Sequence, residues 1–596
     1  MAQRNTYRDD EELEERINLH DILRIGVYLK PYLARIIRIL CVIVMMSCIA
    51  VAVPYLTKIV VDEVIPHKDL RTLSLLVVAM GVLIVIYEFG LRYRTVEITR
   101  VGQLMLKDMR RDLFTHIQTL PFSYFDSRPH GKILIRVVNY VNTLSDTLSS
   151  GLINVISDVF TFLITMVVMF VVDWRLALFS LALFPLLIVW VLVLQHFQRR
   201  AYQALSNKQS NLNAYIHESI AGVKTTQAFA REAEQFRTFQ EQQNEVRSAW
   251  MRAVHVQTLM WPGIQTISVM TIALIYYVGV TGFGAVNVTT GVLIAFVGYA
   301  NNFWNPVISI GNFYNQLITC SAYLERIFET LDVEPAIRNA PGAIDLPQIE
   351  GRVDFNDVVF RYEPDGRNIL NAIDLHVDPG KTIALVGPTG AGKTTIINLL
   401  SRFYDVAEGS VAIDGHDVRD VTLESLRRQM GVMLQDTFIF SGTVRENIRY
   451  GRLDATDEEI MAAARAVHAH EFIIDLPDGY DTVVQERGST LSAGQRQLIA
   501  FARVLLADPR ILILDEATSN IDTRTEEALQ AGLNHLLKGR TSFIIAHRLS
   551  TIENADEICY IDHGRIVEQG SHAELLARKG AYWRLYESQY AMIKAE

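Results

Sequence analysis

The longest run without Asp, Glu, Lys or Arg in this sequence extends from Ala253 to Leu324. A helix of about 20 apolar residues crosses the hydrocarbon core of a bilayer, so this run is too long for one crossing and long enough for two. The glycine-containing segment Gly282–Asn287 lies near its middle and is typical of a turn. The run therefore predicts two membrane-spanning helices joined by a short connection.

Four further apolar segments precede this run. Ile39–Thr57, Leu73–Tyr87 and Leu176–Gln195 contain no charged residue, and Thr147–Val172 is interrupted only by Asp158. Together with the long run they predict a transmembrane domain at residues 39–330 with six spans. The spans are expected at about residues 39–60, 73–92, 147–172, 176–196, 257–281 and 289–318.

Basic residues predict the orientation of these spans. Lysines and arginines are concentrated between spans two and three and between spans four and five, which predicts that both connections are cytoplasmic. Both connections are long and contain few Pro or Gly, so we expect helical extensions that turn near Phe122–Gly131 and near Gly222. An even number of spans leaves both termini in the cytoplasm. The chain is expected to be a multi-pass protein of the plasma (inner) membrane.

The N-terminal segment, residues 1–38, is not predicted to be a cleavable signal. Met1–Arg16 is crowded with charged residues and has no apolar core. Leu19–Arg38 places basic residues among leucines and tyrosines, a pattern typical of an amphipathic helix that lies along a membrane surface.

The composition restricts both the class of protein and its possible partners. Half of the 596 residues are apolar and the mean hydropathy is +0.18, which is too apolar for an ordinary soluble enzyme. The formal net charge of −10 argues against nucleic acid as a partner, because binding a phosphate backbone needs an excess of Lys and Arg. The four cysteines are scattered and predict neither a zinc site nor a disulfide framework.

After residue 330 the pattern changes. Residues 331–350 are rich in Pro, Gly, Asn and Asp and predict a linker, and residues 351–596 alternate strand and helix patterns typical of an α/β domain. The predicted fold is an all-α six-helix transmembrane domain with long cytoplasmic helical extensions, followed by an α/β P-loop ATPase domain.

The strongest single motif is a phosphate-binding loop between the predicted strand Thr382–Val386 and a predicted helix. It satisfies the pattern G-x-x-x-x-G-K-[ST], whose backbone N–H groups wrap phosphates while the lysine reaches the β and γ phosphates and the hydroxyl ligates Mg²⁺. The motif and the residue that follows it are Gly387, Pro388, Thr389, Gly390, Ala391, Gly392, Lys393, Thr394 and Thr395. The cofactors expected here are ATP and Mg²⁺.

A second predicted strand, Ile511–Leu514, ends in Asp515 and Glu516. Acids at the carboxyl end of a buried parallel strand face the phosphate site. Asp515 is expected in the Mg²⁺ shell, and Glu516 is expected to polarise the attacking water.

With these motifs the chain resembles the ATP-binding-cassette transporters, and specifically their exporter-type half-transporters, over essentially its whole length. Leu491-Ser492-Ala493-Gly494-Gln495 is similar to the signature sequence LSGGQ of that family, and Gln485-Glu486-Arg487-Gly488 resembles the exporter x-loop. The other residues that carry the resemblance are Tyr362 for the adenine-stacking aromatic, Gln435 for the Q-loop, Asp522 in the D-loop and His547 for the switch histidine.

The resemblance implies a dimer of nucleotide-binding domains that meet head to tail. Ser492, Gly494 and Gln495 of one subunit would close over ATP held by Lys393 and Tyr362 of the other. His547 would contact the γ-phosphate and hold Glu516 with its water, and Gln435 would sense Mg²⁺. Phe122–Gly131 and Ser219–Thr226 resemble the coupling helices that pass domain closure to the membrane helices.

Two departures from the family pattern bear on the partner. Ala493 replaces a glycine of the signature, and Asn520-Ile521 replaces the commoner Ala-Leu of the D-loop. Both variants resemble those in the catalytically working subunits of heterodimeric exporters. The presence of Lys393, Glu516 and His547 favours a homodimer, with a heterodimer as the alternative.

Polar groups within the spans are the only clues to the cargo. Glu88 and Asp158 are intramembrane acids, and span six places Asn301, Asn302 and Asn305 among aromatic residues. These groups suit a small amphiphilic guest, or alternatively form hydrogen bonds between helices. The expected function is ATP-driven export of a hydrophobic or amphiphilic drug or lipid. The alternatives are an importer of siderophore type and an ATP-gated channel or regulator.

Overall fold

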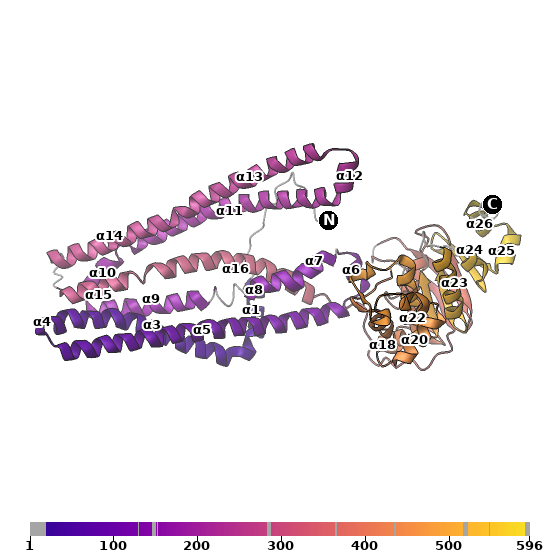
Figure 1. Ribbon diagram of the computed structural model, residues 1–596, viewed down its shortest axis with the longest axis horizontal. Coiled ribbons are helices and arrows are strands. Elements are labelled where there is room, and N and C mark those ends of the chain that lie inside the picture. The colour runs from indigo at the N-terminus through magenta and orange to yellow at the C-terminus, as the bar shows by residue number, and fades with distance from the viewer. Residues whose placement is uncertain are drawn as a thin grey trace. The chain divides into compact units, whose positions relative to one another are not determined.

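The computed structural model (Figure 1) describes residues 19–128, 130–145, 151, 153–282, 288–363, 366–433, 437–515, 523–546 and 549–589. The chain divides into two compact units. The first contains the described residues up to Gln118 and those from His130 to Val333; the second contains Thr119–Arg128 and the residues from Glu334 onward.

The described part of the first unit is helical. Its α-helices are α1 (Leu19–Arg24), α2 (Gly26–Leu29), α3 (Leu33–Ile59), α4 (Ile65–His67), α5 (Leu70–Thr119), α7 (His130–Ile135), α8 (Val141–Ser145), α9 (Ile153–Val172), α10 (Trp174–Leu181), α11 (Phe184–Ala221), α12 (Val223–Ala228), α13 (Glu232–Thr258), α14 (Met260–Thr281), α15 (Thr290–Ala300) and α16 (Trp304–Leu331). A 3₁₀ turn, η1 (Lys30–Tyr32), and two π-helical turns, η2 (Val60–Val64) and η3 (Arg136–Tyr140), join some of them.

Five helical stretches in the described residues are long and apolar enough to cross a membrane. They are His20–His67, Leu70–Thr119, Ile153–Val172, Trp174–Ala221 and Glu232–Thr281. These stretches overlap the first five predicted spans. Residues 146–150 at the start of the third predicted span, and residues 283–287 of the predicted turn, lie outside the described residues.

The sixth predicted span, residues 289–318, is two helices instead of one. α15 ends at Ala300 and α16 begins at Trp304, and the intervening turn is closed by hydrogen bonds from Asn302 N–H to the Tyr299 carbonyl (2.9 Å) and from Phe303 N–H to the Ala300 carbonyl (3.2 Å). Pro306 explains the break, because a proline has no N–H and its ring clashes with the carbonyl four residues earlier in a continuous helix. The charge-free run gives no sign of this interruption, and the prediction of one continuous sixth helix is wrong.

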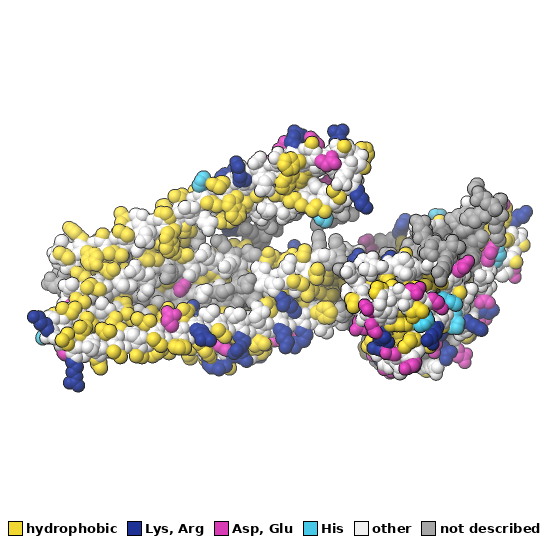
Figure 2. All heavy atoms as spheres, viewed as in Figure 1, with side chains coloured by type: hydrophobic (Ala, Val, Ile, Leu, Met, Phe, Trp, Pro, Cys, Tyr) yellow, Lys and Arg dark blue, Asp and Glu magenta, His cyan; other side chains and the backbone are white. Residues whose placement is uncertain are grey.

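The helical extension between the fourth and fifth stretches is a long antiparallel pair. α11 and α13 lie side by side and α12 joins them at the far end (Figure 1). Leu205 and Leu212 of α11 pack against Val246, Ala249 and Ala253 of α13. Lys and Arg side chains gather at the tip of this pair, whereas hydrophobic side chains cover the α14 end (Figure 2).

The second unit contains two main sheets. The strand order is β2-β1-β4-β5 in an antiparallel sheet and β12-β11-β3-β10-β9-β6 in a largely parallel sheet, and β7 and β8 form a small pair. The strands are β1 (Val353–Phe360), β2 (Leu370–Val377), β3 (Thr382–Val386), β4 (Glu408–Ile413), β5 (His416–Asp417), β6 (Met430–Met433), β7 (Gly442–Thr443), β8 (Val483–Val484), β9 (Ile511–Asp515), β10 (Thr541–Ile545), β11 (Glu557–Asp562) and β12 (Arg565–Gly570).

Helices cover these sheets and complete two hydrophobic cores. They are α17 (Lys393–Leu400), α18 (Leu423–Arg428), α19 (Val444–Arg449), α20 (Asp457–Ala466), α21 (His470–Ile474), α22 (Ala493–Ala507), α23 (Thr523–Leu537), α24 (Leu549–Glu553), α25 (His572–Arg578) and α26 (Ala581–Gln589), with short turns η6 (Gly479–Asp481) and η7 (Glu486–Gly488). β3, β9 and β10 are buried on both faces, as a parallel sheet between helical layers requires.

A short helix that follows α5 in the chain belongs to this second unit. In α6 (Phe122–Asp126), the Phe122 ring lies 4.3 Å from the Phe403 ring, centroid to centroid. The Tyr404 hydroxyl donates to Asp126 Oδ2 at 2.8 Å. One apolar contact and one charge-assisted hydrogen bond therefore hold α6 in the unit.

The second half of the predicted linker, residues 331–350, packs into the second unit. Leu346 and Ile349 are buried in the core of the second unit, and the Ile349 N–H donates to Gln429 Oε1 at 2.9 Å. Ile344 forms an isolated parallel bridge with Val421. The apolar residues between the prolines and glycines account for this packing.

At the end of the bundle remote from the extensions, Asp62 joins α3 to α15. The π-helical turn η2 carries Asp62, whose Oδ1 accepts from the Gly291 N–H at 2.7 Å, and whose Oδ2 accepts from the Thr289 hydroxyl. A Cβ on Gly291 would lie 2.6 Å from the Lys58 carbonyl oxygen, so only glycine permits this approach. Asp62 thus caps the N-terminus of α15 from a different helix.

Asp62→Ala should therefore lower the stability of the membrane unit. Removal of a cap costs about 1 kcal/mol, so the apparent melting temperature of the detergent-solubilised chain should fall. The neighbouring Glu63 is exposed, and Glu63→Ala is the matched control. Equal melting temperatures for the two variants would contradict the role assigned to the cap.

Candidate nucleotide-binding site

The phosphate-binding loop lies at the carboxyl edge of the parallel sheet. It leaves β3 at Val386 and enters α17 at Lys393. Gly387, Gly390 and Gly392 have φ angles of 142°, 81° and 108°, a region that favours glycine. A Cβ on Gly387 would lie 2.0 Å from the Ile561 carbonyl oxygen. The backbone conformation favours glycine at all three positions, and the close approach of β11 additionally requires glycine at Gly387.

Lys393 occupies the position where phosphates are expected. Its Nζ donates to the carbonyl oxygens of Gly387 (2.7 Å) and Pro388 (2.9 Å), so the side chain curls over its own loop. Burial lowers the pKa of Lys393, and the negative charge of Asp515 opposes that shift. A half-buried ammonium whose only hydrogen-bond acceptors in the described residues are carbonyls is suited to an anionic ligand, which would replace neutral acceptors with charged ones.

Asp515 reaches the same edge from two strands away. Leu385 of β3 pairs with Ile545 of β10, and Ile545 pairs with Asp515 of β9. This register places the carboxyl end of β9 level with the start of the loop. Thr394 is exposed on the first turn of α17.

The described residues contain no group of three or more His, Cys, Asp or Glu side chains able to hold a metal ion. One carboxylate, Asp515, and one hydroxyl, Thr394, fit Mg²⁺, which is usually bound by one or two protein ligands together with phosphates and water. The donor set is therefore suited to a magnesium ion that arrives with a nucleotide.

Tyr362 presents an aromatic surface beside the loop. Its ring is 46% exposed and makes edge contacts with the rings of Phe360 (4.8 Å) and Tyr404 (5.1 Å). Its hydroxyl lies 3.1 Å from Thr395 Oγ1 on α17. These contacts fix one edge of the ring and leave a face available for stacking on a base.

Phe360, Tyr404 and Gly564 support this site and were not singled out from the sequence. The Gly564 N–H donates to the Ala391 carbonyl at 3.1 Å and so backs the loop. In the sequence, each of these three residues is only an aromatic residue or a glycine in a strand or turn that carries no motif. Sequence patterns alone do not distinguish such residues from core or turn residues.

The LSAGQ segment forms the N-terminus of α22. Ser492 is the N-cap: its hydroxyl accepts from the Gln495 N–H (3.2 Å), and Gln495 Oε1 accepts from the Ser492 N–H (2.9 Å). Ser492 and Ala493 are exposed, and Gly494 is buried. Ala493 is the first helical residue, where alanine favours the helix over glycine by up to about 1 kcal/mol.

Within the described residues, no hydrogen bond or ion pair joins this helix terminus to the phosphate-binding loop of the same chain. Four other predicted site residues, Gln435, Glu516, Asp522 and His547, lie outside the described residues. Their described neighbours are informative: Glu516 directly follows β9, and His547 follows Ala546 at the end of β10.

Two family models match the chain. That of the ABC transporter transmembrane region matches residues 36–307, and that of the ABC transporter matches residues 370–519. The uncharacterized ABC transporter ATP-binding protein YknV of Bacillus subtilis (strain 168) is 41% identical over 99% of this chain and 98% of its own length. The chain belongs to the ABC transporters.

Two further similarities indicate which kind of ABC transporter this is. The putative multidrug export ATP-binding/permease protein YgaD of Bacillus subtilis (strain 168) is 37% identical over 94% of this chain and 98% of its own length. The structure of a bacterial Atm1-family ABC exporter with ATP bound aligns with a TM-score of 0.76 and 28% identity, over 94% of this chain and 98% of that one.

This ABC transporter is an ATP-driven efflux half-transporter whose soluble domain is an ATPase that binds ATP. A half-transporter works as a membrane-embedded dimer. The predicted fold class, a helical transmembrane domain followed by an α/β nucleotide-binding domain, is confirmed.

Lys393→Ala should weaken ATP binding by roughly tenfold or more, because it removes a charge-assisted hydrogen bond to phosphate. Equilibrium binding of ATP to the purified full-length chain measures this change. Lys381→Ala is the matched control, since Lys381 pairs with Asp556 (3.1 Å) at the opposite end of β3. An unchanged affinity in Lys393→Ala would contradict the assignment.

Proposed function

We propose that this transporter exports a hydrophobic or amphiphilic molecule, drug or lipid, as a homodimer driven by Mg²⁺-ATP. The observation that carries the nucleotide half of the proposal is the convergence of the phosphate-binding loop, Lys393 and Asp515 at one edge of the sheet. The proposed orientation is that of a plasma (inner) membrane protein with both termini and the nucleotide-binding domain in the cytoplasm, as the basic connections favour.

The proposed catalytic groups are Lys393, Glu516 and His547. Lys393 would neutralise charge on the transferred phosphoryl group, which is the main work of such sites. Glu516 would orient and polarise the attacking water from the end of β9, and His547 would hold the γ-phosphate from the end of β10. These strand ends are level in the sheet because Asp515 pairs with Ile545, which supports the two assignments.

Magnesium is proposed to bind through Thr394, Asp515 and Gln435. When bound, the ion would neutralise phosphate charge. The remaining nucleotide contacts are proposed for Tyr362, for residues 387–395 of the loop and helix, for Asp522, and for Ser492, Gly494 and Gln495 of the second subunit. The exposed terminus of α22, with two residues facing outward, supports a contact made across a dimer.

The interruption of span six supports an amphiphilic cargo. Asn301 is exposed and Asn302 is half-buried at the break between α15 and α16. Broken spanning helices often mark binding sites, because their irregular backbone is tolerated only where it lies in protein or lines a polar cavity. The amides and the neighbouring aromatic residues would contact the polar and apolar parts of such a guest.

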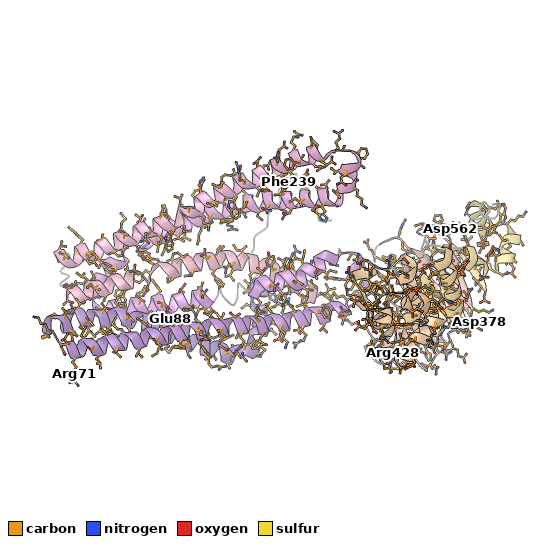
Figure 3. All side chains as sticks on the ribbon, viewed as in Figure 1. Arg71, Glu88, Phe239, Asp378, Arg428 and Asp562 are labelled. Carbon is orange, nitrogen blue, oxygen red and sulfur yellow. The ribbon has the colours of Figure 1, made fainter. Side chains whose placement is uncertain are left out.

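The two intramembrane acids differ in their surroundings. Asp158 of α9 accepts a hydrogen bond from the Ser309 hydroxyl of α16, so it links two helices within the unit. Glu88 lies exposed on α5 (Figure 3). Asp158 therefore has an interhelical role available to it, and Glu88 stays the more open candidate for cargo or subunit contact.

Glu516→Gln should retain ATP binding and reduce hydrolysis by roughly a hundredfold or more, the usual scale for losing a general base. Release of phosphate from Mg²⁺-ATP by the reconstituted full-length chain measures this. Glu458→Gln, an exposed residue of α20, serves as the control. Near-normal turnover in Glu516→Gln would remove Glu516 from the catalytic role.

The homodimer is tested by the chain expressed alone and reconstituted in lipid. Robust Mg²⁺-ATP hydrolysis that is abolished by EDTA and by Glu516→Gln would support two identical subunits. A folded preparation that binds ATP without hydrolysing it would contradict the homodimer and require a second, different subunit. If the chain alone hydrolyses ATP, stimulation of that hydrolysis by candidate amphiphiles would identify the cargo class.

A further inference from the structure

An arginine cluster lies where the membrane spans pass into the helical extensions. Arg35 of α3 pairs with Glu97 of α5, which is only 8% exposed, and Arg94 and Arg100 lie three residues before and after Glu97 on α5. Glu97 pairs with Arg100 and, at 3.9 Å, with Arg35. Arg94 lies one helical turn before Glu97.

Two of these guanidinium groups have a buried N–H donor that makes no hydrogen bond to any residue the structure describes. Arg94 Nη1 donates to the Ser157 hydroxyl of α9 at 2.8 Å, while its Nε is buried and has no hydrogen-bond partner in the described part of the chain. Arg35 Nη1 is likewise buried and makes no hydrogen bond there. An unmade hydrogen bond from a buried charged donor is costly, so such donors call for an acceptor.

The local charge identifies the acceptor as an anion. Arg35 and Arg100 share the Glu97 carboxylate, and Arg94 donates to the neutral Ser157 hydroxyl, which leaves an excess of two positive charges among the three arginines and Glu97. Glu97 pairs with Arg100 and Arg35, and no ion pair in the described residues joins it to Arg94.

The surroundings fit an amphiphile. Ile39 and Ile43 of α3 pack against Ile98 and Val101 of α5 beside the cluster. On the same helices Ile37 (57% exposed) and Val96 (49% exposed) offer apolar surface. An apolar surface next to partly exposed guanidinium groups, at the level where a span meets the membrane interface, matches a lipid with a charged headgroup.

We propose that Arg35 and Arg94 bind the phosphate of an anionic phospholipid beside the contacts that α5 makes with α3 and α9. The planar guanidinium donates paired hydrogen bonds to phosphate oxygens, which a neutral amide or hydroxyl at this place does not match. This lipid site does not depend on which cargo is exported. It adds to the proposed function without depending on it.

Association of spin-labelled phosphatidylglycerol and phosphatidylcholine with the reconstituted full-length chain tests the proposal. The fraction of motionally restricted lipid gives the relative affinity, and nucleotide is omitted, so the result is independent of ATP turnover. The wild-type chain should prefer phosphatidylglycerol, and Arg94→Gln should reduce that preference roughly tenfold, the scale of one charge-assisted hydrogen bond. Arg92→Gln, an exposed arginine on the same helix, should leave it nearly unchanged.

A second variant gives an effect in the opposite direction. Glu97→Gln removes the only carboxylate of the cluster and should raise the preference for phosphatidylglycerol, a gain that a misfolded protein would not show. The proposal is overturned by a wild-type chain without lipid preference, or by equal losses in Arg92→Gln and Arg94→Gln. Displacement of the lipid by inorganic phosphate alone would assign the site to free phosphate and would likewise overturn it.

Discussion

In the hydrocarbon core of a bilayer each backbone N–H and C=O must find its partner within the protein, and the membrane unit depends on this constraint. It explains why the described residues of that unit are helical, and why the one interruption of span six is closed by its own short-range hydrogen bonds at Asn302 and Phe303. Phe303 is 1% exposed, so the irregular backbone there lies against protein. The same demand governs side chains on α9. Ser157, Asp158 and Thr161 each contact a polar group on a different helix: Arg94, Ser309 and Ser47.

In the second unit, the sheet brings anion-binding groups together without a large surplus of positive charge. A parallel sheet places the carboxyl ends of its strands at one edge, and here that edge carries the phosphate-binding loop and Asp515. The loop is confined from behind by Ile561 and Gly564, which is why glycine is required at Gly387. α6 is held against Phe403 and Tyr404, and Tyr404 in turn contacts the ring of Tyr362. A chain of contacts thus connects a helix that directly follows α5 to the proposed adenine-stacking residue.

Much of this could be predicted from the sequence because the signals are local. Charge-free runs predict spans, and the loop motif is contiguous, so the order of domains and the nucleotide site followed from reading the chain. The break in span six was harder to predict from the sequence. Pro306 is visible in the sequence, but many spanning helices tolerate proline, and the packing of α15 on α3 through Gly291 and Asp62 is a contact between distant segments. The packing of Leu346 and Ile349 into the second unit could not be predicted either, because it too is a contact between distant segments.

The sequence by itself determined the order of a helical and an α/β domain, the first five apolar stretches and the phosphate-binding motif, because each depends on composition or on neighbours within a few residues. Only the tertiary structure decided which polar groups in the membrane unit meet. Asp158 faces a serine, Asp62 caps another helix, and Arg94 faces a serine and has a buried donor that makes no hydrogen bond within the described part of the chain. Such pairings depend on how helices far apart in the sequence rotate about their axes and pack, and a periodic pattern fixes the apolar face of a helix but not the partner that each side chain meets.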